Sequence, residues 1–226
     1  MGNPNVGKSV IFSRLTGIGV ISANYPGTTV EYTEGNMKLG GETATLVDAP
    51  GVYSLDPCSR VEEVCGKIFA KGADVVVNVI DATNLERNLN LTLQILERGV
   101  PTVVALNLWD VAVKKGIEID VAALEKELGV PVVPTVAVSG QGIRDLVQSL
   151  DRARAPPAIQ FDSPDQRWAR IGEIAARTQT VHYTHLRAHE TVLDLVCRLL
   201  LEQKKQKQTQ KRSLAEGVPA TPLPAA

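Results

Sequence analysis

The chain has 226 residues, enough for one ordinary domain with an appendage and a sizeable core. Hydrophobic residues make up 44% and charged residues 22%, which excludes a string of membrane spans, and the net charge of −1 gives no overall field for nucleic acid or anionic lipid. The three cysteines, Cys58, Cys65 and Cys197, indicate reduced thiols in a cytosolic chain. No apolar run approaches 18 residues, and the N-terminus lacks a basic segment followed by an apolar stretch, so we expect neither a membrane span nor a signal peptide in this sequence.

The N-terminus carries the pattern G-x-x-x-x-G-K-[ST], formed by Gly2, Gly7, Lys8 and Ser9. This pattern is typical of a phosphate-binding loop, because glycines let successive N–H groups turn toward an anion and the next helix adds its positive dipole end. Lys8 is expected to reach the β and γ phosphates, and Ser9 to hold Mg²⁺. Since only Met1 precedes the loop, we expect a truncated start that lacks the first strand and leaves its neighbours unpaired.

Hydrophobic periodicity and turn residues predict alternating strands and helices after this loop. Helices are predicted over residues 8–15, 58–70, 85–98, 120–128 and 143–152, and strands over 31–36, 42–49, 74–81, 101–108 and 131–138. A loop is predicted over 19–33 and a turn over 38–41. We therefore expect an α/β P-loop NTPase fold of the Ras-like kind, with a mostly parallel, doubly wound sheet that lacks its first strand.

Polar motifs follow the predicted strands, at the sheet edge where ligands bind in such folds. Asp48-x-x-Gly51 can hold Mg²⁺ through water and bring a backbone N–H to the γ phosphate. Either Thr28 or Thr29 in the preceding loop can complete the Mg²⁺ shell when a triphosphate is bound.

The later motifs suit a guanine base. In Asn107-x-x-Asp110 the carboxylate can accept two hydrogen bonds from the base N1–H and the exocyclic amine, a donor pair that adenine lacks. Ser139-Gly140 can place a backbone N–H on the guanine oxygen. Each motif alone is a common turn, but their joint order and placement at strand ends favour a GTP site.

With these motifs, the chain resembles the cytosolic G domain of FeoB, the bacterial ferrous iron transport protein, over about Gly2 to Leu150 and toward Arg177. Leu108 stands where most soluble G proteins have Lys, which favours FeoB over the ribosome-assembly GTPases that share the phosphate loop. The matching segments are Gly2 to Ser9, Tyr25 to Glu31, Val47 to Leu55, Ala105 to Asp110 and Gly129 to Val133.

The resemblance implies roles for particular residues. It aligns Thr29, rather than Thr28, with the Mg²⁺-binding switch threonine, and Asn5 with the asparagine that marks potassium-stimulated members. Val52 stands where Ras-like proteins keep a catalytic Gln, so we expect slow hydrolysis carried by Lys8, Mg²⁺ and K⁺. The nucleotide contacts implied in the phosphate loop are Gly2, Asn3, Asn5, Val6, Gly7, Lys8, Ser9 and Val10.

The expected organisation is a G domain over 1–154, a helical segment over 158–202 and a disordered tail over 203–226. Ser163 and Pro164 predict the capped start of an amphipathic helix. From about Thr178 the chain resembles translated adaptor sequence, so we expect a non-native extension there. In the family, a membrane permease domain follows the G and helical domains and small Feo proteins act as partners, which implies the cytoplasmic face of the bacterial inner membrane and no nucleic-acid partner.

Two other functions stay open from the sequence. One is a soluble GTPase of ribosome assembly, against which Leu108 and the lack of a basic RNA-binding module both count. The other is a nucleotide-binding module or fragment without useful turnover, because a lost central strand weakens the sheet.

Overall fold

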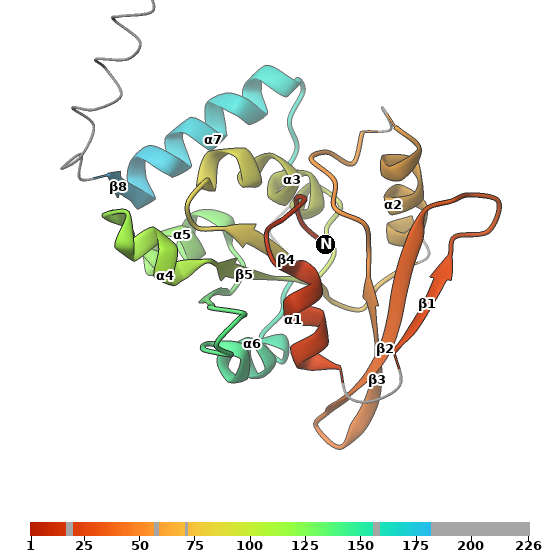
Figure 1. The fold of residues 1–226 in the computed structure, drawn as a ribbon. Coiled ribbons are helices and arrows are strands. Elements are labelled where there is room, and N and C mark those ends of the chain that lie inside the picture. The colour runs from red at the N-terminus through yellow and green to blue at the C-terminus, as the bar shows by residue number, and fades with distance from the viewer. Residues whose placement is uncertain (17–19, 57–58, 71, 156–158, 182–226) are drawn as a thin grey trace, which may run out of the picture. The chain divides into compact units, whose positions relative to one another are not determined.

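The computed structural model describes residues 1–16, 20–56, 59–70, 72–155 and 159–181 (Figure 1). Its helices are α1 (Lys8–Leu15), α2 (Arg60–Ala70), α3 (Leu85–Glu97), α4 (Trp109–Lys114), α5 (Val121–Leu128), α6 (Ile143–Leu150) and α7 (Pro164–Thr178). Its strands are β1 (Ile21–Asn24), β2 (Glu31–Leu39), β3 (Glu42–Asp48), β4 (Val76–Asp81), β5 (Thr102–Asn107), β6 (Ile117–Ile119), β7 (Val132–Pro134) and β8 (Gln179–Val181). The sequence from 182 onward, including the predicted tail, lies outside the described residues.

A parallel sheet with helices on both faces forms the centre of the fold. β5 pairs with β4 on one side and β7 on the other. Because successive side chains of a strand point to opposite faces, β5 contributes to two cores. Leu106 packs with α3, α5 and α7, whereas Val103 packs with α1 and α6. Figure 1 shows α3 and α7 on one side of this sheet and α1 and α6 on the other, which confirms the expected α/β architecture.

A separate antiparallel sheet, in the order β1-β2-β3, corrects the prediction for residues 19–41. β2 and β3 pair from Thr33↔Asp48 to Leu39↔Glu42, so the turn is Gly40–Gly41 and not 38–41. The predicted loop over 19–33 contains β1, which pairs with β2 from Ile21↔Glu34 onward. Its four residues are mostly exposed, and backbone pairing to the edge of β2 makes them a strand.

The chain after β5 also differs from the prediction. β7 ends at Pro134, short of the predicted 138, because the amide of Val136 bonds to the carbonyl of Gln141 at 3.0 Å and turns the chain. α4 and β6, which were not predicted, lie between β5 and α5. α4 begins after Leu108, whose φ of 60° is left-handed, and β6 is a strand because it pairs with β8.

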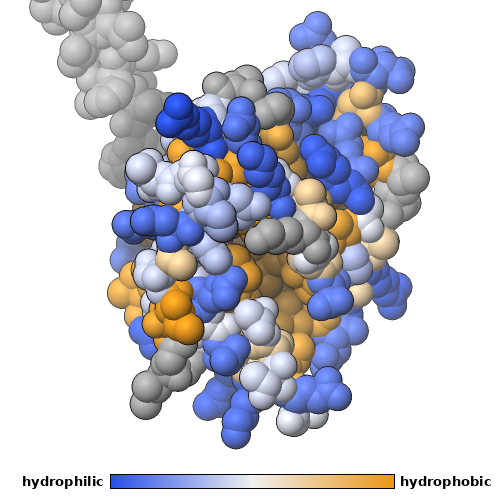
Figure 2. Space-filling view, turned by 90° about the vertical axis from the view of Figure 1, so that its right-hand side faces the viewer, coloured by the Kyte–Doolittle hydropathy of each residue, from blue (hydrophilic) through white to orange (hydrophobic). Residues whose placement is uncertain are grey.

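The N-terminus lies against β4. The amino group of Met1 donates to the carbonyl of Val77 at 2.9 Å, Val79 donates back to Met1 at 2.9 Å, and Gly2 forms a parallel bridge with Val79. Burial lowers the pKa of the Met1 amino group to about 6. In the described residues β3 and β4 are not paired with each other, and an apolar cavity of about 510 Å³ is lined by both strands and α1. Figure 2 shows hydrophobic side chains around a hollow on one face of the molecule.

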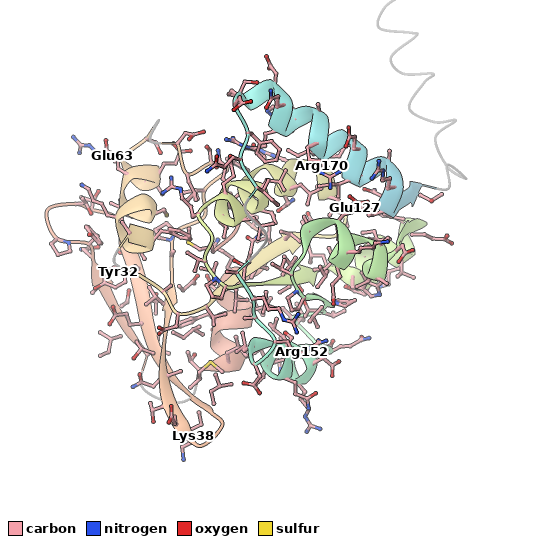
Figure 3. The ribbon with its side chains drawn as sticks, turned by 180° about the vertical axis from the view of Figure 1, so that it is seen from behind. Tyr32, Lys38, Glu63, Glu127, Arg152 and Arg170 are labelled. Atoms are coloured by element: carbon pink, nitrogen blue, oxygen red, sulfur yellow. The ribbon has the colours of Figure 1, made fainter. Side chains whose placement is uncertain are left out.

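The segment after α6 packs against the helices that cover one face of the parallel sheet. Ser163 caps α7 by accepting from the amide of Gln166 at 3.3 Å, as predicted. α7 contacts α3 and α5, and Arg170 of α7 lies beside Glu127 of α5 at 2.7 Å (Figure 3). None of the helices in the described part of the chain has the length and hydropathy needed to cross a bilayer.

Candidate nucleotide-binding site

The phosphate loop between Gly2 and α1 has the backbone of an anion-binding nest. Asn5 and Gly7 have positive φ values of 63° and 88°, and α1 begins directly after Gly7. Such alternation turns consecutive N–H groups toward one point at the positive end of a helix. Gly7 is also required by space, since a Cβ there would lie 2.4 Å from Nδ2 of Asn107.

Asn107, the last residue of β5, joins the phosphate loop to the loop after β7. Its side chain is 2% exposed. Nδ2 donates to the carbonyl of Val6 at 2.8 Å, and Oδ1 accepts from the amide of Ala137 at 3.0 Å and the hydroxyl of Thr135 at 3.3 Å. These hydrogen bonds give the guanine-motif asparagine a structural role between the two loops.

The ammonium group of Lys8 lies beside the loop after β3. Its ammonium donates to the carbonyl of Asn3 at 3.2 Å, and a Cβ on Gly51 would lie 2.9 Å from Nζ. Burial lowers the pKa of Lys8, and the Asp48 carboxylate acts in the opposite direction. The cation and the Gly51 backbone are therefore adjacent, which suits an anion shared between them.

Ser9 and Asp48 place two oxygen ligands together. The Ser9 hydroxyl donates to Oδ2 of Asp48 at 2.7 Å, from the first turn of α1 to the last residue of β3. Hydroxyl and carboxylate oxygens are donors that Mg²⁺ prefers, so the pair fits this ion.

The structure does not bring the switch threonines to this pair. Thr28 donates to the carbonyl of Tyr25 at 2.9 Å and accepts from the amide of Val30 at 3.3 Å, which commits its hydroxyl to the β1–β2 loop. Thr29 is exposed in the same loop, and the described residues show no hydrogen bond from it to Ser9 or Asp48. Figure 1 shows the β1–β2 hairpin extending away from α1.

The residues expected to contact the base lie in the segments after β5 and β7. Asp110 lies in the first turn of α4 with a side chain 41% exposed, paired with Lys114 at 3.6 Å. Ser139 is exposed and donates to the carbonyl of Val136 at 3.2 Å, and Gly140 follows it with a φ of 84°. Arg14 of α1, which the sequence did not single out, donates to the carbonyl of Val138 and so supports this loop.

The remaining phosphate-loop residues point in different directions. The amide of Asn3 is 3% exposed and donates to the carbonyl of Arg87 on α3 at 3.4 Å, so only its main chain faces Lys8. Val6 is buried in the core shared with α1 and α6, and Val10 is 40% exposed. Asn5 is exposed, which leaves its amide oxygen accessible to a cation.

Val52 and Cys65 belong to the core beside the site. Val52 is 3% exposed, and its amide donates to the carbonyl of Gly2 at 3.3 Å. The thiol of Cys65, on α2, is fully buried, and burial raises its pKa to about 11. Cys65 is thus a core residue, while Cys58 and Cys197 lie outside the described residues.

A model of the family described as ferrous iron transport protein B matches residues 1–150 of the chain. The Fe(2+) transporter FeoB of Salmonella typhimurium is 47% identical over 166 residues, which are 71% of this chain and 22% of that protein. FeoB of Escherichia coli (strain K12) is 46% identical over the same length. The chain therefore spans about a fifth of the length of the curated relatives it matches.

Solved structures of FeoB domains are also similar to this chain. The cytosolic domain of L. pneumophila FeoB has a TM-score of 0.74 at 32% identity, with 80% of this chain and 97% of that chain covered. The cytosolic domain of T. maritima FeoB in its GMPPNP form has a TM-score of 0.67 at 37% identity, covering 73% of this chain and 68% of that chain. A GDP-bound variant of S. thermophilus NFeoB has a TM-score of 0.65 at 35% identity, covering 78% and 79%.

Proposed function

The chain belongs to the FeoB family of ferrous iron transport proteins, and we propose that it binds GTP and hydrolyses it slowly to GDP and phosphate. The observation that carries the proposal is one site built from two sheets, with Lys8, Gly51 and the Ser9–Asp48 pair at one end and Asp110, which follows β5, at the other. Asn107 connects the two ends through Val6 and Ala137. The GDP and GMPPNP bound by related structures support guanine nucleotide as the ligand.

Each residue of this site has one task in the proposed reaction. The nest from Gly2 to Ser9 binds the phosphates, and Lys8 with the Gly51 amide stabilises charge on the γ phosphate. Mg²⁺ would be held by Ser9 and Asp48, with Thr29 joining when the β1–β2 loop closes, and K⁺ by Asn5; both ions supply positive charge to the phosphates. Asp110, with Ser139 and Gly140, selects guanine.

Hydrolysis is expected to be slow because the residue after Gly51 has no side chain to hold the attacking water. Val52 is 3% exposed and packs with Leu55 and Cys65, so the γ phosphate meets backbone and not a catalytic amide. In the parent protein the GTP state would regulate Fe²⁺ passage through a covalently linked permease domain, at the cytoplasmic face of the inner membrane. Small Feo proteins are proposed as accessory partners. The FeoB family match decides against the ribosome-assembly alternative.

The test is to titrate fluorescent GDP and ATP analogues and then to follow phosphate release in potassium and in sodium buffer. Guanine-selective binding with faster release in potassium is the expected result, and Asn5→Ala should remove the difference between the two buffers. Equal rates in both buffers would contradict the role of Asn5. Binding without release would support a nucleotide-binding module, and no binding would contradict the proposed function.

A further inference from the structure

The loop after Gly51 is held by one face of α3. Arg87, Asn90, Gln94 and Glu97 are spaced by three and four residues, so they form a stripe along one side of that helix. The guanidinium of Arg87 lies 4.4 Å from the ring centroid of Tyr53, and the amide of Asn90 donates to the carbonyl of Tyr53 at 3.3 Å. Two residues of the stripe, Arg87 and Asn90, therefore contact Tyr53 in this loop.

Gln94 makes hydrogen bonds with three consecutive residues of this loop. Its Oε1 accepts from the backbone amide of Leu55 at 2.7 Å. Its Nε2 donates to the hydroxyl of Ser54 at 2.9 Å and to Oδ2 of Asp56 at 2.8 Å. The side chain is 4% exposed, and its neighbours Leu91 and Ile95 belong to the core beside the loop. A buried amide with both ends bonded to one loop fixes the backbone of that loop.

Asp56 is also approached from α7. Arg167 lies 4.0 Å from Asp56 and 3.2 Å from Glu97, the last residue of the stripe. The Asp56 side chain is 64% exposed, so the longer ion pair contributes little, and the shorter bond from Gln94 dominates.

We propose that Gln94 is a positioning residue for the γ phosphate, acting through the backbone of residues 51–56. The inference rests on the proposed guanine-nucleotide function. Because Val52 has no polar side chain and is buried, recognition of the γ phosphate at this loop depends on the placement of main-chain groups beside Lys8. Gln94 anchors that main chain three to five residues downstream of Gly51, and GDP, which lacks the γ phosphate, does not depend on it.

The experiment compares GDP with a non-hydrolysable GTP analogue in the chain and in Gln94→Leu. Leucine fills a similar volume but leaves the Leu55 amide without its buried acceptor. We expect affinity for the GTP analogue to fall about tenfold to hundredfold, with GDP affinity nearly unchanged, a melting temperature lowered by a few degrees because a buried amide loses its acceptor, and faster hydrogen exchange at the Leu55 amide. Arg98→Gln, an exposed change just past the end of α3, is the matched control and should alter none of these.

A double substitution that reverses the hydrogen bond between residues 94 and 56 separates the proposed role of Gln94 from a folding defect. Gln94→Glu alone sets two carboxylates against each other, and adding Asp56→Asn restores a donor and acceptor in the reverse direction, so the double variant should recover most of the lost affinity. Equal losses for GDP and the GTP analogue, or unchanged exchange at Leu55, would overturn the proposal. Failure of the unmodified chain to bind either nucleotide would instead overturn the proposed function. Hydrogen exchange at Leu55 would still show whether Gln94 holds the backbone of this loop.

Discussion

The side chain of Asn107 donates to the carbonyl of Val6 at 2.8 Å, so the loop expected to bind the base holds the loop expected to bind the phosphates. The same side chain accepts from Ala137 at 3.0 Å. Both partners are main-chain groups in well-packed surroundings, and Val6 and Ala137 belong to one hydrophobic cluster. We therefore expect nucleotide affinity to depend on the integrity of this core.

Asn107→Ala is expected to destabilise the chain by about 2–4 kcal/mol, because it leaves a buried carbonyl and a buried amide without partners. GDP affinity should fall with it, as the phosphate loop loses its support. Urea unfolding and GDP titration measure the two effects. Asn36→Ala, at an exposed position of β2, is the control. Lost GDP binding at unchanged stability would mean that Asn107 acts on the base directly and not through Val6.

The sequence predicted the parts of the site that depend on local patterns. Asp48 and Asn107 are the last residues of β3 and β5, as their motifs after apolar runs indicated, and Ser9 meets Asp48 as the Mg²⁺ prediction requires. The assignment of nucleotide contacts to individual side chains stays a prediction.

What the sequence missed depends on contacts between distant segments. Gln94 lies within a predicted amphipathic helix, and only the fold shows that it meets residues 54–56, about forty positions earlier. β1 and β6 are only four and three residues long, and pairing with β2 and β8 makes them strands. Thr29 lies in the loop that joins β1 to β2, so its position also depends on the pairing of these strands.

Asp110→Asn is expected to weaken GDP binding by at least about a hundredfold, because a site built to accept the guanine donor pair discriminates strongly once that match is lost. Xanthine carries an oxygen where guanine carries the exocyclic amine, so the new amide can donate to it, and affinity for the xanthine nucleotide should rise. Competition titrations with the guanine and xanthine diphosphates measure this change in base preference. Lys114→Ala removes only the exposed ion pair and should leave both affinities unchanged. A parallel loss for both nucleotides would contradict a direct contact with the base.

Ser9→Ala is expected to make GDP binding insensitive to Mg²⁺, because the hydroxyl beside Asp48 is one of the two oxygens proposed to hold the ion. The measurement is GDP affinity with Mg²⁺ in excess and with EDTA. Ser13→Ala, one turn later on α1, removes a hydroxyl that donates only to the carbonyl of Ser9, and should keep the response to Mg²⁺. An undiminished Mg²⁺ effect in Ser9→Ala would show that the ion is held elsewhere.

Docking of α7 onto α5 is expected to weaken in acid through Glu127. This carboxylate accepts from Arg177 at 3.1 Å and from Arg170 at 2.7 Å, and these hydrogen bonds lower its pKa. A carboxyl whose pKa is lower in the folded state stabilises that state above its unfolded pKa, and the contribution disappears as the pH falls through the folded value. Glu127→Gln should therefore lower the urea midpoint at neutral pH, and the difference from the unmodified chain should shrink on acidification.

The control for this titration is Glu42→Gln, an exposed change at the start of β3 that removes the same charge without an arginine partner in the described residues. Its effect on the urea midpoint should be small at every pH. Arg170→Met tests the same contact from α7 and should reproduce part of the pH-dependent loss, since Arg177 still holds one oxygen of Glu127. A difference between Glu127→Gln and the unmodified chain that stays constant or grows in acid would contradict the assignment, because it would come from packing and not from the charge of Glu127.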